Sequence, residues 1–288
     1  IKQIGKSDIS PFDLTIPLPS AQVKSALILS ALQSNGGYIR GGLNSRDHTE
    51  IMLRARGVEC ISYPNGDVYV QTGSLQSIDM VIPKDFSSAS FFIVAALLLP
   101  DIELNIYNIG LNPTRTGLLN VLLQMGANII VQNEREEGGE ITADLLVKSS
   151  NLKGVIVGSD LIPTMIDELP IFSLAASQAH GFTLVTGAED LRKKESDRIA
   201  STCGLMNSFG VNIEELNDGW SITGPQEIQG SEFASNLDHR IAMTGAIAGL
   251  IATSPVTILD PDTVNTSFPS FWTELRKIGD VVLVDKDK

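Results

Sequence analysis

The chain has 288 residues, enough for two domains, and 43% of them are hydrophobic against 19% charged, as in folded rather than disordered proteins. Its 21 Lys and Arg are outnumbered by 34 Asp and Glu, which gives a formal net charge of −13. This net negative charge repels nucleic acid and anionic lipid, so we expect neither as a partner. Any anionic ligand must bind at a local cluster of basic residues.

Several classes of site and segment are not predicted. The two cysteines, Cys60 and Cys203, lie in no CxxC or Cys/His spacing, so we expect no zinc site or disulfide and a reducing, cytoplasmic location. The longest apolar stretches, 91–100 and 241–252, are shorter than the roughly 20 residues of a membrane span. No nucleotide, zinc-protease or serine-hydrolase motif occurs, and the histidines are scattered, so no metal or cofactor is expected.

In chain order, the pattern of a small-residue-rich apolar helix, a strand, an amphipathic helix and further strands occurs four times. The apolar helices are predicted at 20–34, 87–99, 167–179 and 238–252, each opened by Ser or Asp as N-cap and each buried all round. The amphipathic helices end at Gly57, Gly126, Gly210 and Gly279, where glycine supplies a left-handed cap.

Short strands, such as those at 101–109, 182–186 and 256–259, separate these helices. Each repeat is therefore predicted to run β-α-β-α-β-β, which indicates an α/β (α+β) fold with helices packed inside against sheets. One repeat occupies 1–81 and three occupy 82–288, so we expect an incomplete first domain followed by a complete second one.

Basic residues fall at the N-terminal ends of predicted helices, namely Arg46, Arg115, the 192–198 cluster and Arg240. The helix dipole disfavours a cation there unless an anion binds between them. Each residue alone is compatible with a solvated surface charge. The set predicts a site for a ligand with more than one phosphate or carboxylate.

The strongest local signal is a cluster of charges in the segment 191–198. On a helix starting near Lys194, the side chains of Lys194, Glu195 and Arg198 share one side. The alternative is a plain i,i+3 Glu–Arg pair at a helix start. Asp167 precedes a helix with Pro170 in its first turn, so we expect it to be ionised and to accept a proton; the alternative is a plain N-cap.

Three further helix starts carry candidate ligand groups. Arg240 opens the last apolar helix, with a salt bridge to Asp238 as the alternative explanation. The segment 20–24 offers Ser20 and Gln22 to an anion, with an ordinary Ser20 N-cap as the alternative. The segment 45–50 opens the second helix, where a capping box is the alternative.

Eight motifs in order resemble the EPSP synthase (3-phosphoshikimate 1-carboxyvinyltransferase) family of enolpyruvyl transferases, from about residue 10 to the end. They are PSAQVKS at 19–25, SRDHTE at 45–50, DFSSAS at 85–90, NPTR at 112–115, MIDELP at 165–170, LRKKESDR at 191–198, DHRIAM at 238–243 and SFP at 267–269. The resemblance implies a two-domain inside-out α/β barrel, three βαβαββ repeats to a domain, with the active site between the domains.

In that family the N-terminal part supplies further substrate-binding residues, and nothing in this sequence matches them. The resemblance therefore implies the last repeat of the first domain at 1–81 and the whole second domain at 82–288. Either the sequence is a fragment or the first two repeats were lost. Since closure around both substrates assembles such a site, these residues alone are expected to bind weakly and turn over little.

The resemblance also implies transfer of the enolpyruvyl group from phosphoenolpyruvate to the 5-hydroxyl of shikimate 3-phosphate, releasing phosphate, by a monomer without cofactor or metal. Asp167 would take the hydroxyl proton and Glu195 would protonate the methylene carbon. The substrate-binding residues would be Ser20, Ala21, Gln22, Ser45, Arg46 and Lys194 for shikimate 3-phosphate, and Gln22, Arg198 and Arg240 for phosphoenolpyruvate. Where some members carry Lys, this chain has Thr266, which removes one possible phosphoenolpyruvate contact.

Two alternatives stay open. The related UDP-N-acetylglucosamine enolpyruvyl transferase is built on the same repeats, but it is expected to carry a nucleophile-like cysteine in a mobile loop, whereas Cys60 follows a helix-ending glycine in a predicted strand. A non-catalytic binding or structural module would keep the fold without the missing N-terminal residues.

Overall fold

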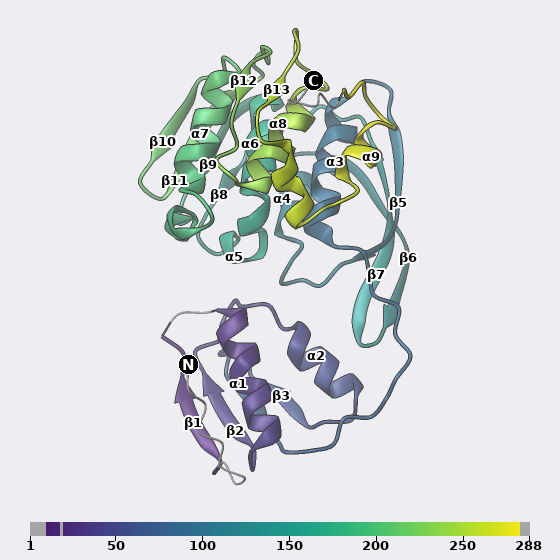
Figure 1. The fold of residues 1–288 in the computed structure, drawn as a ribbon, viewed down its shortest axis with the longest axis vertical. Helices are drawn as coiled ribbons and strands as arrows, with labels where there is room; N and C mark the ends of the chain where they lie inside the picture. Colours follow the sequence, from purple (N-terminus) through teal and green to yellow (C-terminus); the bar gives the residue numbers. More distant parts are fainter. Residues whose placement is uncertain (1–9, 18–19, 283–288) are drawn as a thin grey trace. The chain divides into compact units, whose positions relative to one another are not determined.

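The computed structural model describes residues 10–17 and 20–282, so Pro19 of the first motif lies outside the described residues. The contacts between residues divide the chain into two units. Figure 1 shows the chain coloured along the sequence, from purple to yellow. Unit 1 holds the chain up to Pro83 together with 110–115 and 133–143; unit 2 holds 84–109, 116–132 and the chain from 144 onward. The predicted division into domains at 81 and 82 stays a prediction.

Unit 1 contains one complete βαβαββ repeat. Its elements are β1 (Phe12–Thr15), α1 (Ala21–Gln33), β2 (Gly37–Arg40), α2 (His48–Ala55), β3 (Cys60–Ser62) and β4 (Val68–Val70). They form a sheet of order β1-β2-β4-β3, in which β1 and β2 are parallel and the other pairs antiparallel. Ile28, Ile39 and Val70, each fully buried, lie in the core between this sheet and the helices.

The remaining elements follow the same pattern three more times, the last without its final two strands among residues 10–17 and 20–282. The first contains α3 (Phe86–Leu98), β5 (Glu103–Gly110), α4 (Gly117–Gln124), β6 (Asn128–Glu137) and β7 (Glu140–Lys148). The second contains β8 (Ile156–Val157), α5 (Ile162–Met165), the 3₁₀ helix η1 (Ile166–Glu168), α6 (Leu169–Gln178), β9 (Gly181–Val185), the 3₁₀ helix η2 (Glu189–Lys193), α7 (Arg198–Ser208), β10 (Ile213–Leu216) and β11 (Gly219–Gly224). The third contains β12 (Glu232–Phe233), α8 (His239–Ala248), β13 (Thr257–Ile258), the 3₁₀ helix η3 (Pro261–Thr266) and α9 (Phe271–Leu275).

Strand order confirms the predicted repeat. The sheet β8-β9-β11-β10 has the same order and the same parallel and antiparallel pairs as β1-β2-β4-β3. In the sheet β5-β7-β6, a parallel bridge from Lys84 to Ile109 takes the place of the first strand. Strands β12 and β13 are parallel across α8, as the first two strands of a repeat should be.

Most predicted helix ends are confirmed. Side-chain oxygens of Ser20 and Asp238 cap α1 and α8, as expected. The second apolar helix begins at Phe86 and is capped by Asp85 instead of Ser87, which lies within it. The helix predicted from Asp167 begins at Leu169, after the 3₁₀ turn η1, and its N-cap residue Glu168 makes no side-chain cap bond.

The glycine caps are confirmed at three of the four positions. Gly57, Gly126 and Gly210 have φ values of 81°, 89° and 78°, the left-handed conformation that lets a strand follow at once. Gly279 is not left-handed. A Cβ at that position would lie 2.1 Å from Cδ2 of Leu250, so this side chain would have to shift to admit one.

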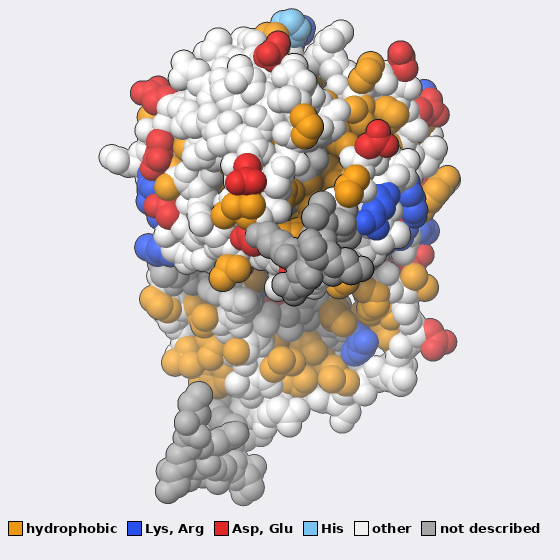
Figure 2. Space-filling view, turned by 45° about the horizontal axis from the view of Figure 1, so that its top comes forward, with side chains coloured by type: hydrophobic (Ala, Val, Ile, Leu, Met, Phe, Trp, Pro, Cys, Tyr) orange, Lys and Arg blue, Asp and Glu red, His pale blue; other side chains and the backbone are white. Residues whose placement is uncertain are grey.

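The apolar helices differ in burial, which corrects the prediction that all four are buried. Helices α3, α6 and α8 contact one another and bury most of their residues. Helix α1 contacts α2, β2 and β4 and buries only Lys24, Ile28, Ala31 and Leu32, leaving Leu29 50% exposed. The face drawn in Figure 2 likewise carries hydrophobic side chains at the surface among charged ones. One repeat alone cannot surround its own apolar helix.

Two neighbouring residues of α1 test this difference. Replacing Ile28, which is fully buried, with Ala is expected to cost about 2–5 kcal/mol of unfolding free energy, because it leaves a cavity. Replacing Leu29, which is 50% exposed, with Ala should cost within about 0.5 kcal/mol. Hydrogen exchange of the β2 and β4 amides measures the unfolding free energy of each variant. Equal losses of unfolding free energy in the two variants would show that α1 is buried all round.

Candidate functional site

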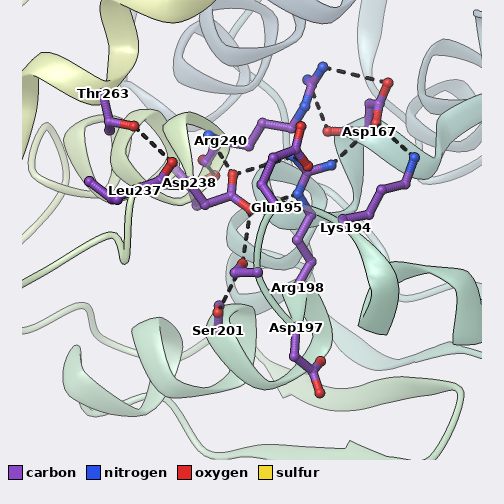
Figure 3. A network of polar contacts seen from close by, with 12 residues as sticks. Asp167, Lys194, Glu195, Asp197, Arg198, Ser201, Leu237, Asp238, Arg240 and Thr263 are labelled. Atoms are coloured by element: carbon purple, nitrogen blue, oxygen red, sulfur yellow. Dashed lines mark hydrogen bonds and ion pairs between the residues drawn. The ribbon is translucent and has the colours of Figure 1, made fainter. Parts of the chain in front are cut away.

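A network of charged side chains in unit 2 joins three segments of the chain, at 167, 194–198 and 238–240 (Figure 3). Its centre is Arg198, the first residue of α7, whose side chain is only 1% exposed. The guanidinium contacts three carboxylates: Nε lies 2.8 Å from Oδ2 of Asp238, Nη1 lies 3.3 Å from Oδ1 of Asp167, and Nη2 lies 2.5 Å from Oε2 of Glu195. A charge this deeply buried is held in place by its partners and is not a solvated surface charge.

Asp167 is the carboxylate on which the cations converge. Besides Arg198, it lies 3.9 Å from Nζ of Lys194 and 3.5 Å from Nη2 of Arg240. Its side chain is 13% exposed, so one side remains open to solvent. Asp167 is the N-cap residue of neither η1 nor α6, so the plain N-cap explanation is wrong.

The start of α7 differs from the prediction. The helix begins at Arg198 with Asp197 as its N-cap, and Lys194 and Glu195 lie in the bend before it. The reason is that the Asp197 carboxylate accepts a hydrogen bond from Ala200 N, 3.1 Å away, and so fixes the first turn. Lys194 and Arg198 still meet at Asp167, and Glu195 joins them through its contact with Arg198.

Asp238 anchors Arg198 and was not predicted as a site residue. Its carboxylate is fully buried and accepts from Arg198 Nε, Ser196 Oγ at 3.0 Å and Arg240 N at 3.0 Å. Burial raises the pKa of Asp238, but the hydrogen bonds and charge of Arg198 with the other donors outweigh burial, and the pKa is lowered. The carboxylate is thus a fixed anion tying the start of α7 to the start of α8.

The side chain of Arg240 does not form the salt bridge with Asp238 that the sequence offers as an alternative. Its guanidinium contacts the Asp167 side chain and, from Nη1 at 3.2 Å, the Asp167 backbone oxygen. Only its backbone N–H bonds Asp238, so the alternative of a salt bridge with Asp238 is wrong. Its Nε is buried without a hydrogen-bond partner among the described residues. The guanidinium thus retains donor capacity toward an anion.

The other predicted residues lie in unit 1, at the starts of α1 and α2. Ser20 is half-buried, and its Oγ accepts from Val23 N at 3.4 Å, so the ordinary N-cap is present whether or not a ligand binds. Ala21 is half-buried and Gln22 is exposed in the first turn of α1. The first turn thus carries free backbone N–H groups beside an exposed amide, the groups that an anion requires.

Ser45 lies close to α1 through a buried ion pair. Nζ of Lys24 lies 2.6 Å from Oε1 of Glu50, with both side chains at most 3% exposed, and it also donates to the Ser45 backbone oxygen at 3.4 Å. The Ser45 hydroxyl donates to Gly42 O at 2.6 Å. Since Glu50 binds Lys24 and Asp47 makes no side-chain cap bond, the capping-box alternative is wrong.

A second polar cluster of unit 1 surrounds the start of α2. Nδ2 of Asn112, a buried residue, donates to Asp47 Oδ1 at 2.8 Å and Glu140 Oε2 at 3.1 Å, and Glu140 Oε1 lies 2.5 Å from His48 Nδ1. Arg46 is half-buried in the preceding turn. Asn112 and Glu140 were not predicted at this site; the NPTR motif marked Asn112, but nothing in the sequence marks its distant partner Glu140.

Both cysteines are unsuited to nucleophilic chemistry. Burial raises the pKa of Cys60 to about 11 and that of Cys203 to about 12. We expect iodoacetamide at pH 8 to modify the native protein at least about 100-fold more slowly than free cysteine, because thiolate is scarce and access is blocked. Mass spectrometry measures both rates, with urea-unfolded protein as the control. A fast native reaction at Cys60 would contradict this.

Within residues 10–17 and 20–282, no group of three or more His, Cys, Asp or Glu side chains is arranged to hold a metal ion. Over the same residues, every helix is too short or too polar to cross a membrane. The described residues thus carry two separate sets of charged and polar side chains, one in each unit.

Comparisons with known proteins bear on these two sets. A family model described as EPSP synthase (3-phosphoshikimate 1-carboxyvinyltransferase) matches residues 2–275. Relatives named 3-phosphoshikimate 1-carboxyvinyltransferase include one from Petrotoga mobilis, 46% identical over 96% of this chain, and one from a Synechococcus species, 44% identical over 96%. This chain spans 65% and 64% of their respective lengths.

A solved structure has the same fold. An EPSP synthase from Acinetobacter baumannii superposes with a TM-score of 0.90 at 38% identity, covering 94% of this chain and 63% of its own. This similarity confirms the predicted α/β fold of the enolpyruvyl transferase type.

Proposed function

Since this chain belongs to the EPSP synthase family, we propose that it takes part in transferring the enolpyruvyl group of phosphoenolpyruvate to the 5-hydroxyl of shikimate 3-phosphate, with release of phosphate. In pathway terms, this is a step toward aromatic amino acids. The chain spans only 65% and 64% of the lengths of these two relatives. Both the reaction and its substrates are therefore proposals for this chain.

The observation that supports it most strongly is the convergence of Lys194, Arg198 and Arg240 on Asp167. Asp167, Glu195 and Asp238 balance the charge of these three cations, so the attraction for an anion comes from directed donors of Lys194 and Arg240 and not from a net positive charge. Both proposed substrates carry a phosphate and a carboxylate. Arg240 and Arg198 are proposed to bind phosphoenolpyruvate through such charge-assisted hydrogen bonds, and Lys194 to bind shikimate 3-phosphate.

Asp167 is proposed to take the proton of the 5-hydroxyl as its oxygen attacks C2 of phosphoenolpyruvate, while Glu195 delivers a proton to the methylene carbon. The Glu195 side chain is 52% exposed beside Arg198, within reach of an arriving ligand.

The cations would also stabilise the charge of the tetrahedral intermediate, which then loses phosphate from C2 and a proton from its new methyl group to give the enolpyruvyl product. Arg198 is held by Asp238 before any ligand arrives, so its position costs no reorganisation during the reaction. In unit 1, Ser20, Ala21, Gln22, Ser45 and Arg46 are proposed to contact shikimate 3-phosphate. The buried Lys24–Glu50 pair beside Ser45 would hold these groups of unit 1 in place.

The two alternatives receive less support. The buried thiol of Cys60, with its raised pKa, does not suit the nucleophile-like cysteine expected of a UDP-N-acetylglucosamine enolpyruvyl transferase. A non-catalytic module has no evident need for Asp167 among three cations, or for the exposed carboxylate of Glu195 beside Arg198. We further propose a cytoplasmic monomer; size-exclusion chromatography with light scattering tests the oligomeric state.

The test is an assay of the protein at its full gene-encoded length with phosphoenolpyruvate and shikimate 3-phosphate, followed by phosphate release and phosphorus NMR of the product. UDP-N-acetylglucosamine replaces the acceptor in a parallel reaction. Product formation only with shikimate 3-phosphate is the expected result. Product only with the nucleotide sugar, or none with either, would refute the proposal. The 288-residue chain assayed beside it is expected to be slow, and an equal rate would contradict that expectation.

A further inference from the structure

The turn that leads into α8 holds two consecutive non-glycine residues in the left-handed backbone region. Asn236 has a φ of 55° and Leu237 a φ of 63°. Asparagine adopts this conformation readily, whereas leucine does so at a cost in conformational free energy, so other contacts must hold it. The Leu237 side chain is 77% exposed, and its own packing therefore does not supply those contacts.

Asp260, between β13 and η3, supplies them through its carboxylate. Oδ1 accepts from Ser235 N at 2.7 Å, and Oδ2 accepts from Ser235 Oγ at 2.7 Å and from Leu237 N at 3.2 Å. On the other side of the turn, the Thr263 hydroxyl donates to Leu237 O at 2.9 Å (Figure 3). Residues about 25 positions further along the chain thus hold the backbone on both sides of the left-handed leucine.

Three donors on one carboxylate call for its charged form. Burial raises the pKa of Asp260, but the hydrogen bonds from Ser235 and Leu237 outweigh burial and lower it. An ionised carboxylate only accepts hydrogen bonds, which matches three donors. The amide of asparagine has one accepting oxygen and would turn an NH₂ group toward one of those donors.

The residues directly after this turn belong to the cation cluster. Asp238 follows Leu237 and binds Arg198, and Arg240 reaches Asp167 from the first turn of α8. We propose that Asp260 is a positioning residue for the phosphoenolpyruvate site: by holding the left-handed turn at Asn236 and Leu237, it sets where Arg240 meets Asp167. The kinetic part of this inference rests on the proposed function.

The kinetic test compares Asp260→Asn with the wild type in the protein at its full gene-encoded length. We expect KM for phosphoenolpyruvate to rise about fivefold or more, while kcat and KM for shikimate 3-phosphate change less than about twofold. Asp262→Asn is the matched control, since Asp262 is an exposed carboxylate two residues further on. It should leave all three parameters unchanged.

Rescue by glycine separates positioning from general stability. Glycine adopts a positive φ without the cost that leucine meets, so Leu237→Gly lets the turn form with less help from Asp260. In the double variant Asp260→Asn/Leu237→Gly, the rise in KM for phosphoenolpyruvate should be at most half of that in Asp260→Asn. Leu237→Gly alone should have the KM of the wild type. Equal changes in all kinetic parameters, or no rescue by glycine, would overturn the proposal.

A measurement without turnover keeps this proposal distinct from the proposed function. If Asp260 and Arg240 act through the same turn, the losses in Tm from Asp260→Asn and Arg240→Gln should be non-additive, with the double variant losing less than the sum. Additive losses would overturn the positioning role even in an inactive protein. A wild type that makes no product would refute the proposed reaction while the Tm cycle still decides the role of Asp260.

Discussion

Replacing Arg198 with methionine is expected to lower the unfolding free energy of unit 2 by about 3–5 kcal/mol, because it leaves the buried carboxylate of Asp238 without its cation. The two side chains are 1% and 0% exposed, so water cannot take the place of the guanidinium. Both tryptophans of the chain, Trp220 and Trp272, lie in unit 2, so their fluorescence during urea unfolding follows this unit alone.

The control for this prediction is Arg192→Met. Arg192 also contacts two carboxylates, Asp197 and Glu215, but its side chain is 29% exposed and those of its partners are 41% and 43% exposed. Solvated pairs of this kind contribute about 0–1 kcal/mol. A loss at Arg198 no larger than that at Arg192 would mean that the buried network is not needed for stability.

The same ion pair predicts a dependence on acid. The folded pKa of Asp238 lies below its ordinary value of 3.8, so its contribution to stability is present above pH 3.8 and is lost as pH falls through the lower folded pKa. The variant Asp238→Asn lacks this titration. Its unfolding free energy is lower at neutral pH and should fall less steeply below pH 3.8 than that of the wild type. Parallel curves in urea titrations would contradict the assignment.

Replacing Asp167 with asparagine is expected to lower kcat by about 10²–10⁴, the range typical of a lost general base, with much smaller changes in KM. Asparagine keeps the size and hydrogen bonding of the side chain but cannot take a proton. It also removes the negative charge shared by Lys194, Arg198 and Arg240, so phosphoenolpyruvate should bind as well as before or better.

Steady-state kinetics of the protein at its full gene-encoded length measure this effect. Asp190→Asn is the control, because Asp190 pairs with Lys193 at 3.7 Å and both side chains are mostly exposed. Its kcat should equal that of the wild type. A raised KM with unchanged kcat in Asp167→Asn would assign Asp167 to substrate binding instead of proton transfer.

The sequence by itself determined the repeat and most helix ends, because those signals are local. A glycine that takes a positive φ, as at Gly57, Gly126 and Gly210, ends a helix through contacts within a few residues. Caps such as Ser20 and Asp238 bind backbone N–H groups two or three residues ahead. Glu195 and Arg198 are only three positions apart, so they were predicted as neighbours even though α7 starts later than expected.

Only the tertiary structure decided which of these side chains share a site and which residues hold them. Asp238 meets Arg198 across 40 positions, and Asp260 meets Ser235 across 25, so no spacing in the sequence marks either pair. The burial of the apolar helices depends on neighbours as well: α3, α6 and α8 cover one another, while α1, which opens the same repeat pattern, keeps an exposed face. Local hydrogen bonds fix where an element ends, whereas burial and charge pairing depend on what the fold places beside it.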